Sequence, residues 1–351
     1  KKMNIKIILL FISFLLIIHF NLFSQEKNKI HTIAFYNVEN LFDTLDNPST
    51  YDDSRTPDGK DNWTSKIYWK KVENISKVIS EIGYDETNAL PTIVGLCEVE
   101  NKNVIVDLVN TEKLKKGNYG IVHYDSPDER GIDVALIYKK NLFKPLNTNS
   151  TFLDIYDEER NRQDYTRDQL VVEGYLENEK IYLIVNHWPS RSGGELRSRP
   201  FRNKAAELNR RIIDSIQSIN KKAKIITMGD FNDDPINESI KKILNTKSDK
   251  ANLGKFDMYN PMEKMHREGR GTLAYRDNWN LFDQIIFSSS LISENKSNFS
   301  YYKTYIYSKK YLYNQSGRYK GYPFRSFAGG SFLDGYSDHL PVYILLIKEM
   351  K

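Results

Sequence analysis

Short apolar runs recur through this chain, and several are followed at once by carboxylate or amide side chains. The run at residues 225–228 is the most informative, because a glycine and then a cluster of Asp and Asn residues follow it. A run this short and apolar predicts a buried strand. Side chains two apart on an extended segment point the same way, so Asp230 and Asn232 are expected to project together from the strand end. Asp, Asn, Gly and Pro also favour turns, so this segment alone leaves a plain strand-to-turn junction open.

The same pattern appears at other predicted strands, at residues 31–36, 91–97, 180–185 and 281–287, and before a last strand at 343–347. Between the first two, apolar residues at helical spacing predict a helix over 65–82. A strand, a helix and a strand in this order indicate α/β layering. The polar side chains at or within these strands are Asn37, Glu39, Glu98, His187, Asp283, Asp338 and His339. So many polar clusters are hard to explain by turns alone, and we expect them to share one site.

The rest of the chain fits one domain over residues 29–350, without an internal repeat. Neighbouring strands are predicted at 119–125 and 132–138, a hairpin at 169–175 and 180–185, and helices at 200–219 and 238–244. Asp133 stands inside a predicted strand, where an ion pair with Arg130 is favoured over a place in the site. The tyrosine-rich segment 301–328 either stacks on bases or sugars or forms a surface loop packed by its own aromatic rings.

Residues 1–24 are predicted to be a signal peptide, because lysines precede a charge-free apolar run at 7–18 and Ser24 offers a small residue for cleavage. An uncleaved membrane anchor is the alternative. Either reading places the remaining chain outside the cytoplasm, in the periplasm or secreted. After cleavage of the leader we expect no stable membrane embedding.

The charge balance, the single cysteine and the histidine spacing limit the kinds of ligand and metal site that the chain can form. The chain has 51 basic and 46 acidic residues, and three of the lysines belong to the leader, so a basic field over the whole molecule gives no argument for nucleic acid. The single cysteine, Cys97, excludes an intramolecular disulfide and a cysteine-ligated metal. Zinc held by histidines is disfavoured because no His-x-x-x-His spacing occurs.

The residue types fit phosphoryl chemistry. Carboxylates such as Glu98 and Glu39 can ligate Mg²⁺ or Mn²⁺. Two histidines and an aspartate can transfer protons, and asparagines can steady an oxyanion. Arginines crowd the segment after His187, where they form either a solvated cationic face or contacts to phosphate oxygens. These are Arg191, Arg197, Arg199 and Arg202.

Six motifs together resemble the endonuclease/exonuclease/phosphatase superfamily, in that family's order and over nearly the whole mature chain. They are Asn37 after a strand, Glu98 in CEVEN, His187 in NHWPS, GDFND at 229–233, Asp283 in LFDQIIFS and SDHLPV at 337–342. The resemblance implies a four-layer α/β sandwich, in which two packed mixed β-sheets are flanked by helices and the site lies where loops of both sheets meet. The forms NVENLFD and HWPSRSGGE resemble an exported bacterial subgroup.

The resemblance also implies roles. Glu98 would be the chief metal ligand, with help from Asn37, Glu39 and Asp338. His339 would be the general base, oriented by Asp283, and His187 would assist the phosphate or the leaving group. Asp230 and Asn232 would contact the scissile phosphate, the nucleophile or a second metal. Arg167 resembles the family's phosphate-binding arginine, and with Arg191, Arg199 and Arg202 it completes the predicted substrate-binding set.

We therefore expect an exported phosphodiesterase that depends on Mg²⁺, with Mn²⁺ as an alternative, and that hydrolyses DNA or RNA. A phospholipid or phosphosugar phosphodiesterase or phosphatase of the same superfamily is the second reading. A non-catalytic binding module is the third, although it predicts a lost base or metal ligand and none is missing. The expected partner is a phosphodiester substrate, a nucleic acid in the first reading, and no protein partner is predicted.

Overall fold

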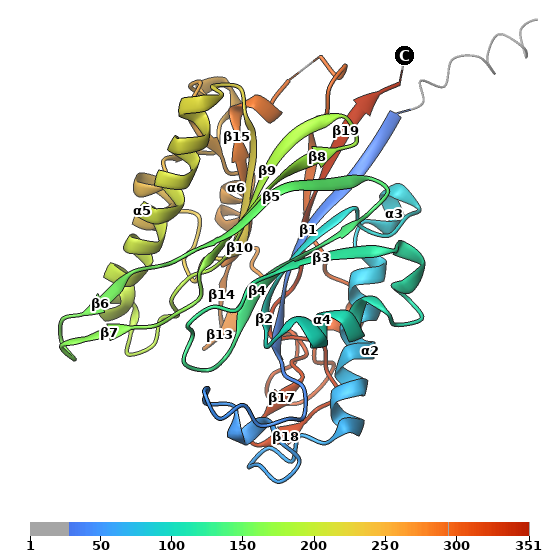
Figure 1. Cartoon of the computed structure of the whole chain (residues 1–351), viewed down its shortest axis with the longest axis vertical. Helices are drawn as coiled ribbons and strands as arrows, with labels where there is room; N and C mark the ends of the chain where they lie inside the picture. The colour runs from blue at the N-terminus through green and yellow to red at the C-terminus, as the bar shows by residue number, and fades with distance from the viewer. Residues whose placement is uncertain (1–27, 294, 351) are drawn as a thin grey trace, which may run out of the picture.

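The computed structural model describes residues 28–293 and 295–350 (Figure 1). The predicted signal peptide at residues 1–24 lies outside the described residues. Within the described part of the chain, no helix has both the length and the hydrophobicity needed to cross a membrane.

The first sheet has six strands in the order β16-β19-β1-β2-β4-β3. β1 and β2 run parallel, and the other neighbours pair antiparallel, so the sheet is mixed. Its strands are β1 (Asn28–Leu41), β2 (Ile93–Val99), β3 (Tyr119–His123), β4 (Asp133–Lys139), β16 (Ser300–Ile306) and β19 (Val342–Glu349).

The second sheet has seven strands in the order β11-β12-β15-β10-β9-β8-β5. β9 and β10 run parallel at its centre, and β15 pairs with β10 antiparallel. Its strands are β5 (Phe143–Thr151), β8 (Gln169–Leu176), β9 (Glu179–His187), β10 (Lys224–Asp230), β11 (Thr246–Lys247), β12 (Met258–Tyr259) and β15 (Asp283–Ser288).

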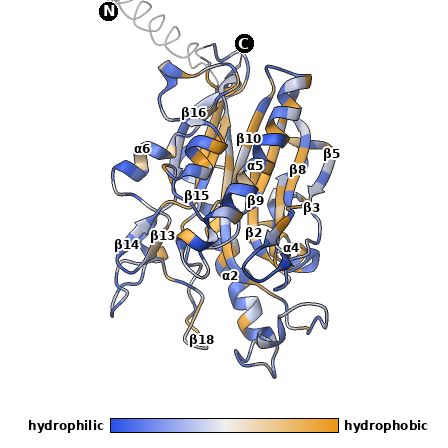
Figure 2. Ribbon diagram, turned by 90° about the vertical axis from the view of Figure 1, so that its left-hand side faces the viewer, coloured by the Kyte–Doolittle hydropathy of each residue, from blue (hydrophilic) through white to orange (hydrophobic). Residues whose placement is uncertain are grey.

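Helices cover the outer faces of both sheets, and the predicted four-layer α/β sandwich is confirmed. In Figure 1, α2 (Ser65–Glu81) and α4 (Lys102–Val109) lie to the right and α5 (Glu195–Ile219) to the left. Figure 2 shows apolar residues concentrated along the strands and polar residues on the loops and outer helix faces. The sheets approach closely at Gly95 of β2, where a Cβ atom would meet the sulfur of Met228 on β10 at 2.8 Å.

Smaller elements fill the connections. Three two-stranded hairpins are β6 (Ile155–Asp157) with β7 (Arg162–Asp164), β13 (Leu273–Tyr275) with β14 (Asn278–Asn280), and β17 (Phe327–Ala328) with β18 (Ser331–Phe332). Short helices are α3 (Tyr84–Thr87), α6 (Met262–Arg267), a π-helix at Ser239–Ile243 and 3₁₀ turns at Asp53–Arg55, Lys115–Gly117, Lys250–Asn252, Ser289–Leu291 and Lys310–Leu312.

Two predicted boundaries are corrected by the structure. The helix expected from residue 200 begins at Glu195, because Glu195 pairs with Arg199 at 2.7 Å and the hydroxyl of Ser198 donates to the Gly194 carbonyl, which together stabilise the first turn ahead of Pro200. The start of the tyrosine-rich segment is not a loop, because β16 forms an edge strand on β19. There the ring of Tyr305 stacks on Tyr343, which supports the structural reading for that tyrosine.

Candidate active site

Strand register brings three of the predicted site residues together on the second sheet. Asp230, the last residue of β10, lies opposite His187 on β9 and opposite Asp283 on β15. On the first sheet, Asn37 of β1 lies opposite Cys97, one residue before Glu98. Because β1 and β2 pack against β9, β10 and β15, these two sets of strand ends meet at the same place between the sheets.

A β-bulge aims the side chain of Glu98. The register of β2 shifts between Cys97 and Val99 against both neighbouring strands, and Glu98 has a φ angle of 60°. A left-handed backbone at a residue other than glycine costs of order 1–3 kcal/mol and is kept where the surroundings hold it. Here the backbone N–H of Asn40 donates to Glu98 Oε2 at 2.9 Å. The fold therefore keeps a strained backbone at the residue that the sequence predicts to be the chief metal ligand.

The carboxylates of the two sheets meet around the amide of Asn37. Its Nδ2 atom donates to Glu98 Oε1 at 3.2 Å and to Asp230 Oδ2 at 3.1 Å, while Oδ1 accepts the Glu39 N–H at 2.9 Å. The Nε2 atom of His187 lies 3.8 Å from Glu98 Oε1 and 3.7 Å from Asp230 Oδ2. Asn37 thus acts as a hydrogen-bond donor here, and the predicted cluster forms around Asp230.

The two histidines of the cluster differ in their electrostatic surroundings. His339 Nδ1 lies 2.7 Å from Asp283 Oδ2, and Nε2 lies 3.8 Å from Asp230 Oδ2. Burial alone would lower the pKa of His339, but the carboxylates of Asp283 and Asp230 outweigh it and raise that pKa well above its usual value. Burial, together with the charge of Arg167, lowers the pKa of His187 well below its usual value. Burial also raises the pKa of Asp230 to about 6.

Asn232 is fixed beside Asp230 by its backbone. It has a φ angle of 50°, its N–H donates to Asp230 Oδ1 at 2.9 Å, and its Nδ2 donates to the Trp188 carbonyl at 3.0 Å. The ring of Phe231 is buried and meets Trp188 edge to face at 4.6 Å. The expected pairing of Asp230 with Asn232 is present, but a left-handed turn after the end of β10 holds it and not the alternation of an extended strand.

The residues present fit a divalent cation of the Mg²⁺ type. Glu98 and Asp230 offer carboxylate oxygens, the ligands that hard cations prefer. Asp283 Oδ1 is buried and has no hydrogen-bond partner in the described part of the chain. One ligand atom each from Asp230, Asp283 and His339 lies within 4.8 Å of the others. Buried carboxylates this close need positive charge to offset their repulsion.

The arginines predicted to bind substrate after His187 form ion pairs with carboxylates of the protein itself. The side chain of Arg202 is fully buried, and its Nε lies 2.7 Å from Asp233 Oδ1, which argues against its predicted role in binding substrate. Arg191 donates to the Asn232 carbonyl and pairs with Asp233 at 3.2 Å, and Arg199 pairs with Glu195. The contacts of Arg191 and Arg202 fasten the start of α5 to the loop after β10, whereas the Arg199–Glu195 pair lies within the helix.

Arg167 is also buried. It pairs with Asp128 at 2.9 Å and donates to the Trp188 carbonyl at 2.7 Å, the same carbonyl that accepts from Asn232. In this arrangement Arg167 supports the wall of the site, and its charge acts on His187.

Glu39 and Asp338, two of the predicted metal ligands, share an arginine that the sequence reasoning missed. Arg325 Nε lies 3.1 Å from Glu39 Oε1, and Nη2 lies 3.1 Å from Asp338 Oδ2. The other oxygen of Glu39 accepts from the backbone and hydroxyl of Ser326. Both oxygens of Glu39 are thus engaged, which argues against its predicted role as a metal ligand. No motif marks Arg325, and its charge within the tyrosine-rich segment was the only available signal.

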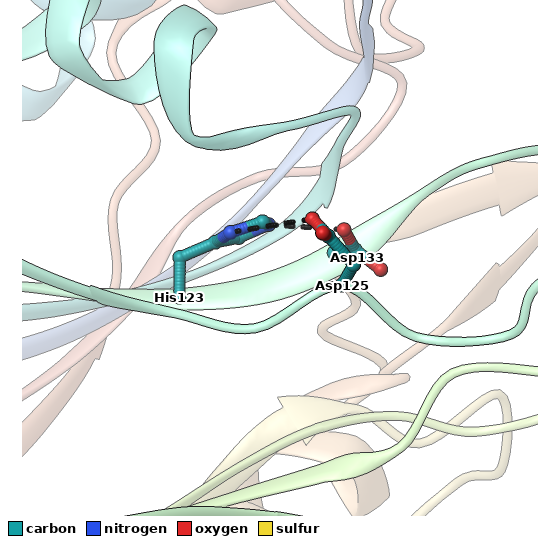
Figure 3. A group of neighbouring side chains, drawn as sticks. All are labelled: His123, Asp125 and Asp133. Atoms are coloured by element: carbon teal, nitrogen blue, oxygen red, sulfur yellow. Dashed lines mark hydrogen bonds and ion pairs between the residues drawn. The ribbon is translucent and has the colours of Figure 1, made fainter. Parts of the chain in front are cut away.

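A second group of possible ligands, His123, Asp125 and Asp133, lies at β3 and β4 of the first sheet (Figure 3). His123 Nε2 lies 2.9 Å from Asp133 Oδ2, whereas Nδ1 faces the exposed Asp125 at 3.9 Å. Asp133 Oδ1 accepts from the backbone of Ser126 at 2.8 Å. The two ring nitrogens of His123 thus face different carboxylates, one buried and one exposed. The predicted pair between Asp133 and Arg130 is wrong, because the β3–β4 hairpin brings His123 to Asp133 instead.

Comparison with known proteins finds a matching family and solved structures with the same fold. Residues 32–348 match the model of the Endonuclease/Exonuclease/phosphatase family. Among solved structures, D. rerio TDP2 in complex with a single-strand DNA product is 14% identical, with a TM-score of 0.52 over 91% of this chain and 99% of that one. A mannosyl-6-phosphatase from Bacteroides thetaiotaomicron is 16% identical, with a TM-score of 0.50 over 90% and 99%. At these identities the likeness shows the fold alone. A comparison with curated proteins found no match.

Proposed function

The chain belongs to the endonuclease/exonuclease/phosphatase family, and on that premise we propose that it hydrolyses phosphate esters with a divalent cation at the cluster around Asp230. The observation that carries the proposal is the meeting of Glu98, Asp230 and the His339–Asp283 pair between the two sheets. A hard-cation site beside a histidine that can take a proton from water is what hydrolysis of a phosphate ester requires.

Each side chain of the cluster has a separate role in the proposed reaction. Asp283 accepts a hydrogen bond from the Nδ1–H of His339, which leaves the unprotonated Nε2 to take a proton from the attacking water. Glu98 and Asp230 would hold Mg²⁺ or Mn²⁺, which would supply a Lewis acid to polarise the phosphate and offset its developing charge. The amide of Asn232 keeps one N–H beyond its bond to the Trp188 carbonyl, and such a donor does not repel an anion. The amide of Asn37 positions the carboxylates of Glu98 and Asp230. His187, neutral because its pKa is low, assists at the phosphate or the leaving group.

A nuclease is the first candidate. The D. rerio TDP2 structure shares this fold and contains a single-strand DNA product. Arg325 lies half-exposed at the edge of the site. Its guanidinium suits a substrate with several phosphates, because it can bond to phosphate oxygens. A sugar phosphatase is the second candidate, since the mannosyl-6-phosphatase has the same fold. We further propose that the enzyme acts in the periplasm or is secreted, which rests on the leader pattern of residues 1–24.

The test is a panel of plasmid DNA, single-stranded DNA, RNA, bis-p-nitrophenyl phosphate, sphingomyelin and mannose 6-phosphate, each with Mg²⁺, Mn²⁺ or chelator. Cleavage of nucleic acid with no release of phosphate from mannose 6-phosphate supports the nuclease. The reverse result supports the sugar phosphatase. If no phosphate ester in the panel is hydrolysed with either metal, the proposed function is wrong.

A further inference from the structure

Arg325 stands at the edge of the active site with part of its guanidinium exposed. Its Nε and Nη2 atoms bond to Glu39 and Asp338, each at 3.1 Å. The side chain is 46% exposed, and within the described residues Nη1 has no hydrogen-bond partner. A planar guanidinium held along one edge presents its remaining N–H groups in a fixed direction.

A buried network holds Arg325 in this position. Glu39 is 3% exposed, and its second oxygen accepts from the backbone N–H of Ser326 at 2.6 Å and from the Ser326 hydroxyl at 2.9 Å. Lys71 of α2, which is fully buried, donates to the same hydroxyl. Burying a lysine and a glutamate is costly unless their partners are fixed. The network therefore fixes the backbone at residues 325 and 326, and with it the direction of the guanidinium.

The same network is joined to the centre of the site. The backbone N–H of Glu39 donates to Asn37 Oδ1, and Asn37 Nδ2 bridges Glu98 and Asp230. Asp338, the other partner of Arg325, immediately precedes His339 in the chain. Arg325 is thus placed beside the reacting centre by contacts on both of its sides.

Neutralising two carboxylates does not by itself account for this arrangement. Asp338 is 28% exposed, so water already screens part of its charge. Arg55 lies nearby, with its guanidinium over the ring of Phe327 at 4.8 Å, but its side chain is only 18% exposed and its Nε pairs with Asp61 at 3.4 Å. Arg325 keeps a half-exposed guanidinium edge beside the site, and such an edge suits an anion other than the one being cleaved.

We propose that Arg325 contacts a second phosphoryl group of the substrate, next to the one that is hydrolysed. This proposal rests on the proposed function, which supplies the first phosphoryl group, and it identifies the substrate as one with at least two neighbouring phosphates. A nucleic acid strand has this chemistry, whereas a simple sugar monophosphate lacks it.

The test compares thymidine 3′,5′-bisphosphate with thymidine 5′-monophosphate by titration calorimetry, with Ca²⁺ as the cation. Wild-type protein should bind the bisphosphate about tenfold tighter, the range expected for one charge-assisted contact. Arg325→Ala should remove that preference, because it should weaken binding of the bisphosphate about tenfold more than binding of the monophosphate. Arg318→Ala, an exposed arginine of the same segment, is the matched control and should behave as wild type.

Equal weakening of both ligands in Arg325→Ala would overturn the proposal, because Arg325 would then act only by positioning Glu39 and Asp338. No preference for the bisphosphate in the wild type, or no binding of either ligand, would also overturn it. The proposed function fails separately, if bis-p-nitrophenyl phosphate is not hydrolysed while the bisphosphate preference persists. Turnover without the preference would instead leave the proposed function standing and reject the role of Arg325.

Discussion

His339 Nδ1 and Asp283 Oδ2 lie 2.7 Å apart, and the Asp283 side chain is fully buried. Asp283 takes its position from the antiparallel register of β15 on β10, where it lies opposite Asp230. The imidazole belongs to the segment before β19 of the other sheet. This pair therefore joins the two sheets at the point where the candidate metal ligands meet.

Replacing His339 with alanine should lower the rate of hydrolysis by about 10²–10⁴-fold, because a positioned general base contributes that much. The overall fold should be retained, as judged by circular dichroism. The unpaired Asp283 carboxylate should reduce the free energy of unfolding by about 1–3 kcal/mol. Release of p-nitrophenol measures the rate, and near-normal turnover on the true substrate would reject His339 as the base.

Replacing Asp283 with asparagine should shift the pH profile of the reaction. The charge of Asp283 helps to raise the pKa of His339, so removing it should lower that pKa. A base works only when it is neutral, so the rising limb of the profile should move to lower pH while the maximal rate falls. Both proteins are measured at the same metal concentration. An unchanged midpoint would mean that His339 does not control this limb.

Arg202 and Arg199 lie one helical turn apart on α5, and they form a matched pair for stability. Arg202→Met breaks a buried ion pair with Asp233 and should cost about 3–5 kcal/mol of unfolding free energy. Arg199→Met removes only the exposed pair with Glu195 and should cost about 0–1 kcal/mol. Urea denaturation measures both. If Arg202→Met unfolded like the wild type and only raised the KM, Arg202 would be a substrate contact after all.

The sequence predicted most of the parts of the fold that local pattern controls. The buried strands, the amphipathic helix at Ser65–Glu81 and the polar side chains at strand ends follow from periodicity. The polar edge strand Phe143–Thr151 was missed, because it has few apolar positions and gains its place only by pairing with β8. The resemblance supplied the order of the motifs, and the register of the strands explains why those motifs converge.

Contacts between distant segments could not be predicted in the same way. Glu39 and Arg325 are separated by 286 positions, and the local sequence around either residue does not predict that the two are in contact. The buried arginine at position 202 looked like part of a basic surface, because sequence shows charge but not burial. The bulge at Glu98 likewise depends on both neighbouring strands, which no short segment reveals.

The most direct test of the account is the Mg²⁺ dependence of bis-p-nitrophenyl phosphate hydrolysis in wild type, Glu98→Gln and the control Glu112→Gln. Glu112 is 86% exposed and lies outside the site. We predict that chelator abolishes turnover and that Mg²⁺ restores it in the wild type and the control. Glu98→Gln should need a much higher Mg²⁺ concentration or fail to recover. Turnover that persists in chelator, or a Glu98→Gln enzyme with the Mg²⁺ dependence of the wild type, would contradict the account.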